Sequence, residues 1–196
     1  MRKISIAAFL FSLTYILSGC GSDSENTPTV AKSDSVQKNP FEFYKRVEIR
    51  PGVSFEALSW GRGVDTLGGY TILMADSVRH QYKSIGGSRE GQIQAFWNLD
   101  LDNDGNPELY LQTKNSSNLS DLLVFEYEGS DFNKISFPTL SSKTKSRLAG
   151  PDKFSIKGGE LFRTIPVKGE KEGAADTVMN IKYVLQENSF SVKDVK

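Results

Sequence analysis

An acidic turn between two apolar runs constrains the fold of this chain more than any other segment. In residues 92–99 polar and apolar side chains alternate, and one face is expected to carry Ile93, Ala95, Trp97 and Leu99. Leu109 and Leu111 follow the turn and are expected on the same face. A period of two residues is typical of a strand with one buried side. Because Asp104-Gly105 supplies turn chemistry between the runs, the segment predicts a β-hairpin.

The turn also carries a set of oxygen ligands. Carboxylates recur at every second residue, and the predicted ligands are Asp100, Asp102, Asp104, the backbone carbonyl of Asn106, and Glu108. Calcium prefers hard oxygen donors in such spacing. The loop differs from an EF-hand, because Leu111 occupies the twelfth position, where a bidentate Glu is needed. Two interpretations stay open: a calcium loop, or an acidic turn that binds nothing.

The amino terminus has the anatomy of an export signal. A short basic segment precedes an apolar run that ends in Leu17-Ser18-Gly19-Cys20, which resembles the bacterial lipoprotein signal. This resemblance implies cleavage after residue 19 and lipidation of Cys20, the only cysteine. We therefore expect a signal peptide at 1–19 and, at 20–40, the lipidated cysteine with a disordered linker.

Lipidation predicts a membrane-anchored protein of the cell envelope. Two or three acyl chains hold a protein stably on a bilayer, whereas one does not. Gly21 after the cysteine resembles the signals that direct lipoproteins to the outer membrane. We therefore expect the protein to be anchored on the periplasmic or the surface face of that membrane. Because Arg2 and Lys3 leave with the signal, the mature chain has a formal charge of −2, which gives no reason to expect a nucleic-acid partner.

Residues 41–196 are predicted to form one all-β domain. We count nine or ten short strands and no amphipathic helix, which favours a single antiparallel sheet, sandwich or partial barrel. Residues 121–127 are apolar on both faces, which is typical of a central strand. Residues 59–69 are predicted to be a loop, and 141–150 a loop or one helical turn.

Several motifs in the domain resemble one family. They are Gly68-Gly69-Tyr70, the acidic hairpin 100–108, the strand 121–127, and the tail segments 150–154, 160–167 and 181–185. Their order resembles that of the periplasmic inhibitors of invertebrate-type lysozymes and related lipoproteins. The resemblance covers residues 68–192. It implies a β domain that inhibits a lysozyme through a loop, which enters the enzyme's cleft and faces the two catalytic carboxylates.

The resemblance places that loop at residues 114–120. Lys114 can pair with a carboxylate, and Ser116, Ser117 and Asn118 offer hydrogen-bonding groups. The glycines and the tyrosine of the family's loop are absent here, which favours inheritance of the fold over inheritance of the activity.

No enzyme is predicted. His80, the only histidine, has Asp76 and Ser77 nearby in sequence but no nucleophile motif. Trp60 and Tyr82 are candidates for an exposed aromatic contact with a sugar or protein. We therefore expect a binding protein for an envelope protein such as a lysozyme, or for a glycan. The alternative is a calcium-stabilised structural module without a ligand.

Overall fold

The computed structural model describes residues 41–61, 68–169 and 175–195. These residues form twelve strands in three antiparallel sheets and one short helix, which confirms the all-β prediction. All of these elements belong to one compact unit. The predicted signal peptide, Cys20 and the linker lie outside the described residues.

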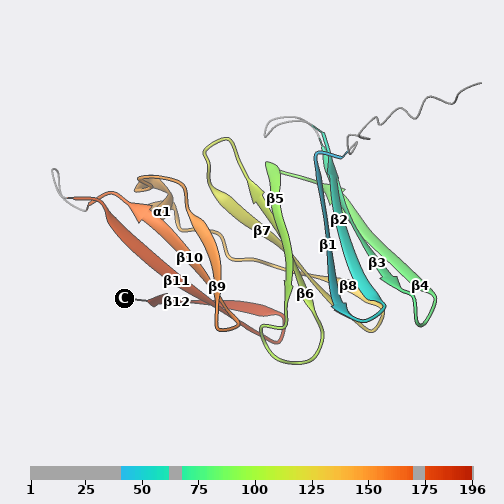
Figure 1. Cartoon of the computed structure of the whole chain (residues 1–196). Coiled ribbons are helices and arrows are strands. Elements are labelled where there is room, and N and C mark those ends of the chain that lie inside the picture. The colour runs from blue at the N-terminus through green and yellow to red at the C-terminus, as the bar shows by residue number, and fades with distance from the viewer. Residues whose placement is uncertain (1–40, 62–67, 170–174, 196) are drawn as a thin grey trace, which may run out of the picture. The chain divides into compact units, whose positions relative to one another are not determined.

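Each sheet is built from four strands that follow one another along the chain (Figure 1). The N-terminal sheet contains β1 (Phe43–Arg50), β2 (Val53–Trp60), β3 (Gly69–Asp76) and β4 (Gln81–Ser88). The middle sheet contains β5 (Gln92–Leu99), β6 (Glu108–Lys114), β7 (Ser120–Glu128) and β8 (Asp131–Ile135). After α1 (Ser142–Ser146), the C-terminal sheet contains β9 (Lys153–Lys157), β10 (Glu160–Val167), β11 (Thr177–Gln186) and β12 (Ser189–Val195).

The strand number exceeds the nine or ten expected. Strands such as β4, whose side chains are mostly exposed, show little apolar alternation but still pair along their whole length. The predicted loop at 59–69 was wrong at both ends, because Ser59 and Trp60 complete β2 and Gly69 begins β3. Within 141–150, α1 supplies the single helical turn.

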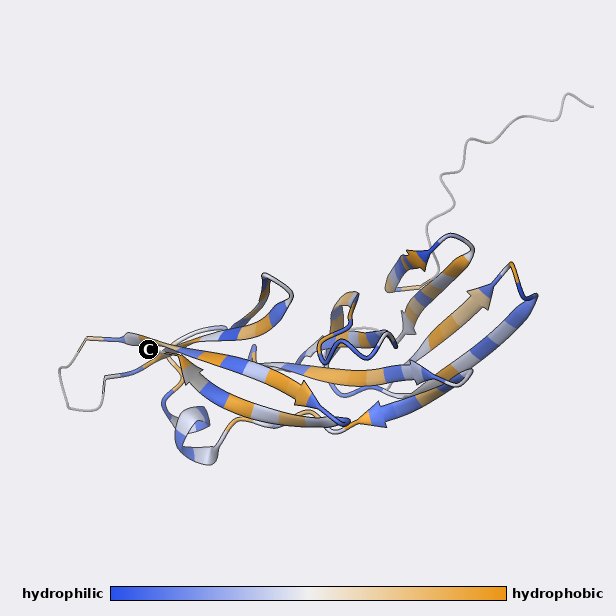
Figure 2. Cartoon of the chain, turned by 90° about the horizontal axis from the view of Figure 1, so that it is seen from below, coloured by the Kyte–Doolittle hydropathy of each residue, from blue (hydrophilic) through white to orange (hydrophobic). Residues whose placement is uncertain are grey.

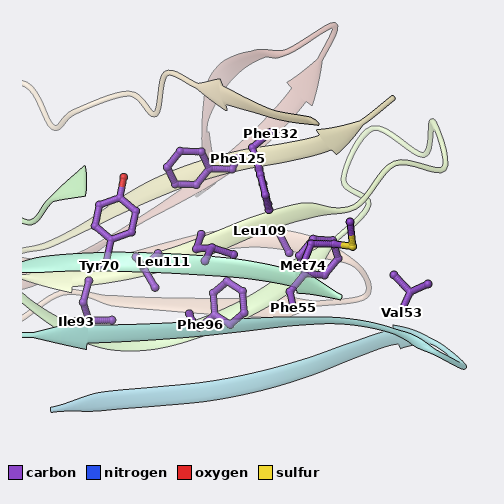
Figure 3. Close-up of a cluster of buried hydrophobic side chains, with 12 residues drawn as sticks. Val53, Phe55, Tyr70, Met74, Ile93, Phe96, Leu109, Leu111, Phe125 and Phe132 are labelled. Carbon is purple, nitrogen blue, oxygen red and sulfur yellow. The ribbon is translucent and has the colours of Figure 1, made fainter. Parts of the chain in front are cut away.

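Two apolar cores hold the three sheets together. One lies between the N-terminal and middle sheets, where Phe55, Ile72 and Met74 pack against Leu109, Leu111 and Phe125 (Figure 3). The other lies between the middle and C-terminal sheets, where Leu122 and Val124 pack against Leu161, Ile165 and Tyr183. Alternating colours along the strands in Figure 2 show the patterning behind these cores.

β7 confirms the prediction of a central strand that is apolar on both faces. Leu123 and Phe125 face the first core, whereas Leu122 and Val124 face the second. The middle sheet is therefore covered on both sides, which explains why β7 reads as a continuous apolar run.

β5 does not alternate strictly, and this part of the prediction was wrong. Its register against β6 shifts between Ile93 and Ala95, as expected of a β-bulge. Ile93 and Phe96 consequently face the first core, while Trp97 and Leu99 face the second. Leu109 and Leu111 lie opposite Asn98 and Phe96, so they occupy the other face from Trp97 and Leu99.

Candidate functional site: an acidic loop on the middle sheet

The β5–β6 hairpin brings four carboxyl groups together at one end of the middle sheet. Asp100, Asp102, Asp104 and Glu108 each offer an oxygen, and these oxygens all lie within 4.8 Å of one another. Opposite ligands of a calcium ion are about 4.6–5.2 Å apart, since each lies roughly 2.3–2.6 Å from the ion. The spacing of the four oxygens is therefore compatible with one shared ion.

Glu108 is the buried member of this acidic cluster. Its side chain is fully buried at the first position of β6, and the face it shares with Tyr110 turns toward the C-terminal sheet. Its Oε2 accepts hydrogen bonds from the backbone N–H of Leu101 at 2.7 Å and from the Tyr110 hydroxyl at 3.4 Å. Its Oε1, like the buried Oδ1 of Asp102, has no hydrogen-bond partner among the described residues. Buried unpaired oxygens are costly, so a cation that contacted these two atoms would stabilise them.

Electrostatics at the site disfavour negative charge. Burial raises the pKa of the Glu108 carboxyl to about 8, and Asp102 and Asp100 act in the same direction. The hydrogen bonds from Leu101 and Tyr110 oppose this effect without cancelling it. Burial, with Glu108 nearby, also raises the pKa of the Tyr110 hydroxyl. A cation among the acids would compensate these repulsions.

Backbone geometry holds the exposed aspartates in place. The N–H of Gly105 donates to Asp100 Oδ2 at 3.2 Å, and Gly105 has a φ of 90°, a conformation that favours glycine. Asn106 donates its backbone N–H and its Nδ2 to the two oxygens of Asp104, both at 2.8 Å. The side chain of Asn106 therefore supports Asp104. Ligation of an ion by the backbone carbonyl of Asn106 remains a prediction.

Two neighbours of the acidic cluster were missed by the sequence analysis. Glu126 on β7 lies directly opposite Glu108 in the strand register and is also buried. Burial raises its pKa, and Asp104, Glu128 and Asp102 add to the effect, while the hydrogen bond from Asn188 lowers it. Asn188 belongs to the β11–β12 turn, and its Nδ2 donates to Glu126 Oε2 at 3.0 Å. The strand register of the middle sheet brings Glu126 to the loop, and the packing of the C-terminal sheet brings Asn188.

An aromatic stack adjoins Glu108. The rings of Trp97 and Tyr110 are stacked, with centroids 5.6 Å apart and an interplanar angle of 3°. The Tyr110 hydroxyl donates a hydrogen bond to Glu108. This bond connects the aromatic stack to the buried carboxyl group of the acidic cluster.

The predicted partner-binding loop connects β6 to β7. Ser116, Ser117 and Asn118 are exposed, and Lys114 is half-buried at the end of β6. Asn115 organises the loop, since its Oδ1 accepts from the N–H groups of Ser117 and Leu119, each at 3.0 Å. The loop is thus an ordered, exposed connection.

A buried ion pair fixes the base of this loop. Asp152 accepts from the Ser120 N–H at 2.8 Å and from Arg163 Nε at 2.6 Å, and Arg163 also donates to the Ser120 carbonyl at 2.5 Å. Both charged side chains are almost completely buried. The guanidinium lies over the Phe154 ring, 4.8 Å from its centroid. Sequence reasoning missed this network because its members lie in separate segments.

The remaining candidate residues lie on the N-terminal sheet: Asp76, His80 and Tyr82 at the β3–β4 hairpin end, and Trp60 at the end of β2. His80 is exposed in the β3–β4 turn, while Asp76 accepts from the backbone N–H groups of Val78 and Arg79. Trp60 is half-exposed, and its ring packs on Gly69, where an added Cβ would lie 2.3 Å from the indole. Tyr82 is 81% exposed on β4.

Comparisons with protein-family models, with curated proteins and with solved structures find no match to this chain. The resemblance to lysozyme inhibitors therefore stays a prediction. Within the part of the chain that the structure describes, no helix has the length and apolar character to cross a bilayer.

Proposed function

We propose that this protein is a calcium-binding, non-enzymatic module of the cell envelope, anchored by lipid on Cys20. The observation that carries the calcium assignment is Glu108. Its carboxyl group is fully buried, one of its oxygens has no partner among the described residues, and it faces three aspartates. A hard divalent cation supplies the charge and the coordination that these oxygens need.

The donor set favours calcium over magnesium. Calcium takes six to eight oxygen ligands in flexible geometry, whereas magnesium demands an octahedron and usually binds one or two carboxylates with several waters. Three carboxylates on the irregular loop and a fourth at the start of β6 match calcium better. The predicted export supports the same ion, because extracellular modules bind calcium with Kd of about 10⁻⁴–10⁻³ M.

Calcium is expected to stabilise the folded domain. At roughly 100 times Kd, an ion that binds only the folded state adds about 2.7 kcal/mol to the free energy of unfolding. For a domain of this size, that corresponds to an increase in Tm of roughly 5–10 °C. Asp102→Ala should abolish this increase, because Asp102 contributes one of the two buried unpartnered oxygens. Calorimetric melting with added calcium and with a chelator measures the effect.

Asp121→Ala is the matched control. Asp121 is an exposed aspartate at the far end of β7, opposite Thr113 rather than Glu108. Its variant should keep the full response to calcium. A response that survives Asp102→Ala would place the ion elsewhere, and an unchanged Tm of the wild-type protein at 10 mM calcium would contradict a calcium role.

A second function, binding of a partner protein through residues 114–120, is favoured by the geometry of that loop. The loop is exposed, ordered by Asn115, and fixed at its base by Asp152 and Arg163. A preorganised loop loses little conformational entropy when it enters a cleft. The partner implied by the resemblance is a lysozyme, and the alternative ligand is an envelope glycan.

Inhibition of a lysozyme is testable by hydrolysis assays across a panel that includes invertebrate-type enzymes. We expect the wild-type protein to reduce the rate of at least one enzyme, and Ser116→Asp with Ser117→Asp to abolish inhibition, because acids repel the catalytic carboxylates. Ser142→Asp with Ser146→Asp adds the same charge on exposed positions of α1 and should inhibit normally. Unchanged hydrolysis across the panel rejects the lysozyme as partner.

A further inference from the structure

The β11–β12 turn lies beside the acidic loop. A single hollow is lined by residues 101–104 of the loop and by residues 184–187 at the end of β11. Glu187 and Asn188 form the two-residue turn and both have positive φ, 47° and 59°. Such turns favour Asn-Gly, so Glu187 occupies a strained conformation. Strain of this kind persists where surrounding contacts impose it.

Glu126 connects this turn to the acidic cluster. It is opposite Glu108 in the β6–β7 register, and Asn188 Nδ2 donates to its Oε2 at 3.0 Å. Directly opposed like charges destabilise a sheet. Glu126 is not among the four acids whose oxygens lie within 4.8 Å of one another. It therefore lies beside the cluster as a fifth carboxyl group, outside the set of predicted direct ligands.

We propose that Asn188 is a positioning residue of the ion site: it holds Glu126 toward the cluster, so that the ion ties the β11–β12 turn to the β5–β6 loop. The inference rests on the proposed calcium function. Groups just outside the direct ligands of a metal orient those ligands, and their loss typically lowers metal affinity about 10–100-fold. Calcium bound in the loop of the middle sheet thus stabilises a turn of the C-terminal sheet.

Calcium titration of the full chain by calorimetry tests this role. Asn188→Ala is expected to weaken calcium binding about tenfold. Glu126→Gln keeps an acceptor for Asn188 but removes the charge, and it is expected to weaken binding to a similar extent. The double variant should lose little more, because residues that act as one unit are not additive.

His80→Ala is the control for backbone effects. His80 also has a positive φ, 53°, in the β3–β4 turn, and its variant should bind calcium as the wild type does. Hydrogen exchange supplies a second readout, because a general loss of stability does not selectively remove the calcium-dependent protection of one segment. In the wild type, calcium should slow the exchange of the β11–β12 turn amides. In Asn188→Ala, saturating calcium should no longer slow exchange in this turn, but it should still slow exchange in residues 100–108.

The outcomes separate the two proposals. If the wild type binds calcium but Asn188→Ala and Glu126→Gln bind it equally tightly, and protection stays confined to the loop, the role of Asn188 is overturned. If the wild type binds no calcium, the proposed function is overturned, and the inference with it.

Discussion

Glu108→Gln is expected to stabilise the calcium-free protein at pH 8 and to remove its response to calcium. The folded chain holds this carboxyl with a pKa of about 8, against 4.5 for an ordinary glutamate. The folded state therefore binds a proton that the unfolded state lacks between these pH values, and the free energy of unfolding falls as the pH rises through them. Glutamine has no charge to lose, and the gain at pH 8 is roughly 2–4 kcal/mol.

Chemical denaturation at pH 5 and pH 8, with and without calcium, measures this effect. Without calcium, the wild type should be less stable at pH 8 than at pH 5, and calcium should reduce the difference. The Glu108→Gln variant should show a smaller difference and no calcium response. Asp121→Gln changes an exposed carboxylate instead and should behave as the wild type does. A variant that is less stable than the wild type at pH 8 without calcium would contradict the expectation.

Arg163→Met is expected to produce the second large effect, a loss of about 3–5 kcal/mol in the free energy of unfolding. The substitution leaves the buried Asp152 carboxylate without its charged partner and the Ser120 carbonyl without its 2.5 Å donor. It also removes the cation from the Phe154 ring. Because Ser120 ends the β6–β7 connection, the exposed loop should exchange its amide hydrogens faster.

Urea unfolding quantifies this loss as a lower midpoint with an unchanged slope. Adding Asp152→Asn to Arg163→Met should recover part of the stability, since an amide carries no charge and still accepts from the Ser120 N–H. Lys182→Met is the control, because it breaks a partly exposed pair with Glu160 and should cost less than about 1 kcal/mol. A loss below 1 kcal/mol for Arg163→Met would show that the network contributes little.

The features that sequence reasoning predicted are local ones. The acidic hairpin was predictable because its turn chemistry and its ligand spacing lie within one short segment, Asp100 to Glu108. The central position of β7 was predictable because both of its faces are apolar, a property of consecutive residues.

The features that were missed depend on tertiary packing. The bulge at Ile93 and Ala95 moves Trp97 to the face opposite the one that strict alternation predicts, and no residue type there signals it. The pairing of Glu126 with Glu108 depends on strand register, and its bond to Asn188 depends on how the C-terminal sheet packs against the middle one. Short periodic patterns carry none of this information.

Terbium luminescence tests the calcium site most directly. Terbium replaces calcium at oxygen sites and emits when a nearby aromatic ring absorbs light, and Tyr110, stacked on Trp97, donates its hydroxyl to Glu108. We expect the wild-type protein to give emission that saturates at one ion per chain, is reversed by excess calcium, and disappears in Asp102→Ala. Emission that does not saturate, or that is equally strong in Asp102→Ala, would contradict an ion held by this loop.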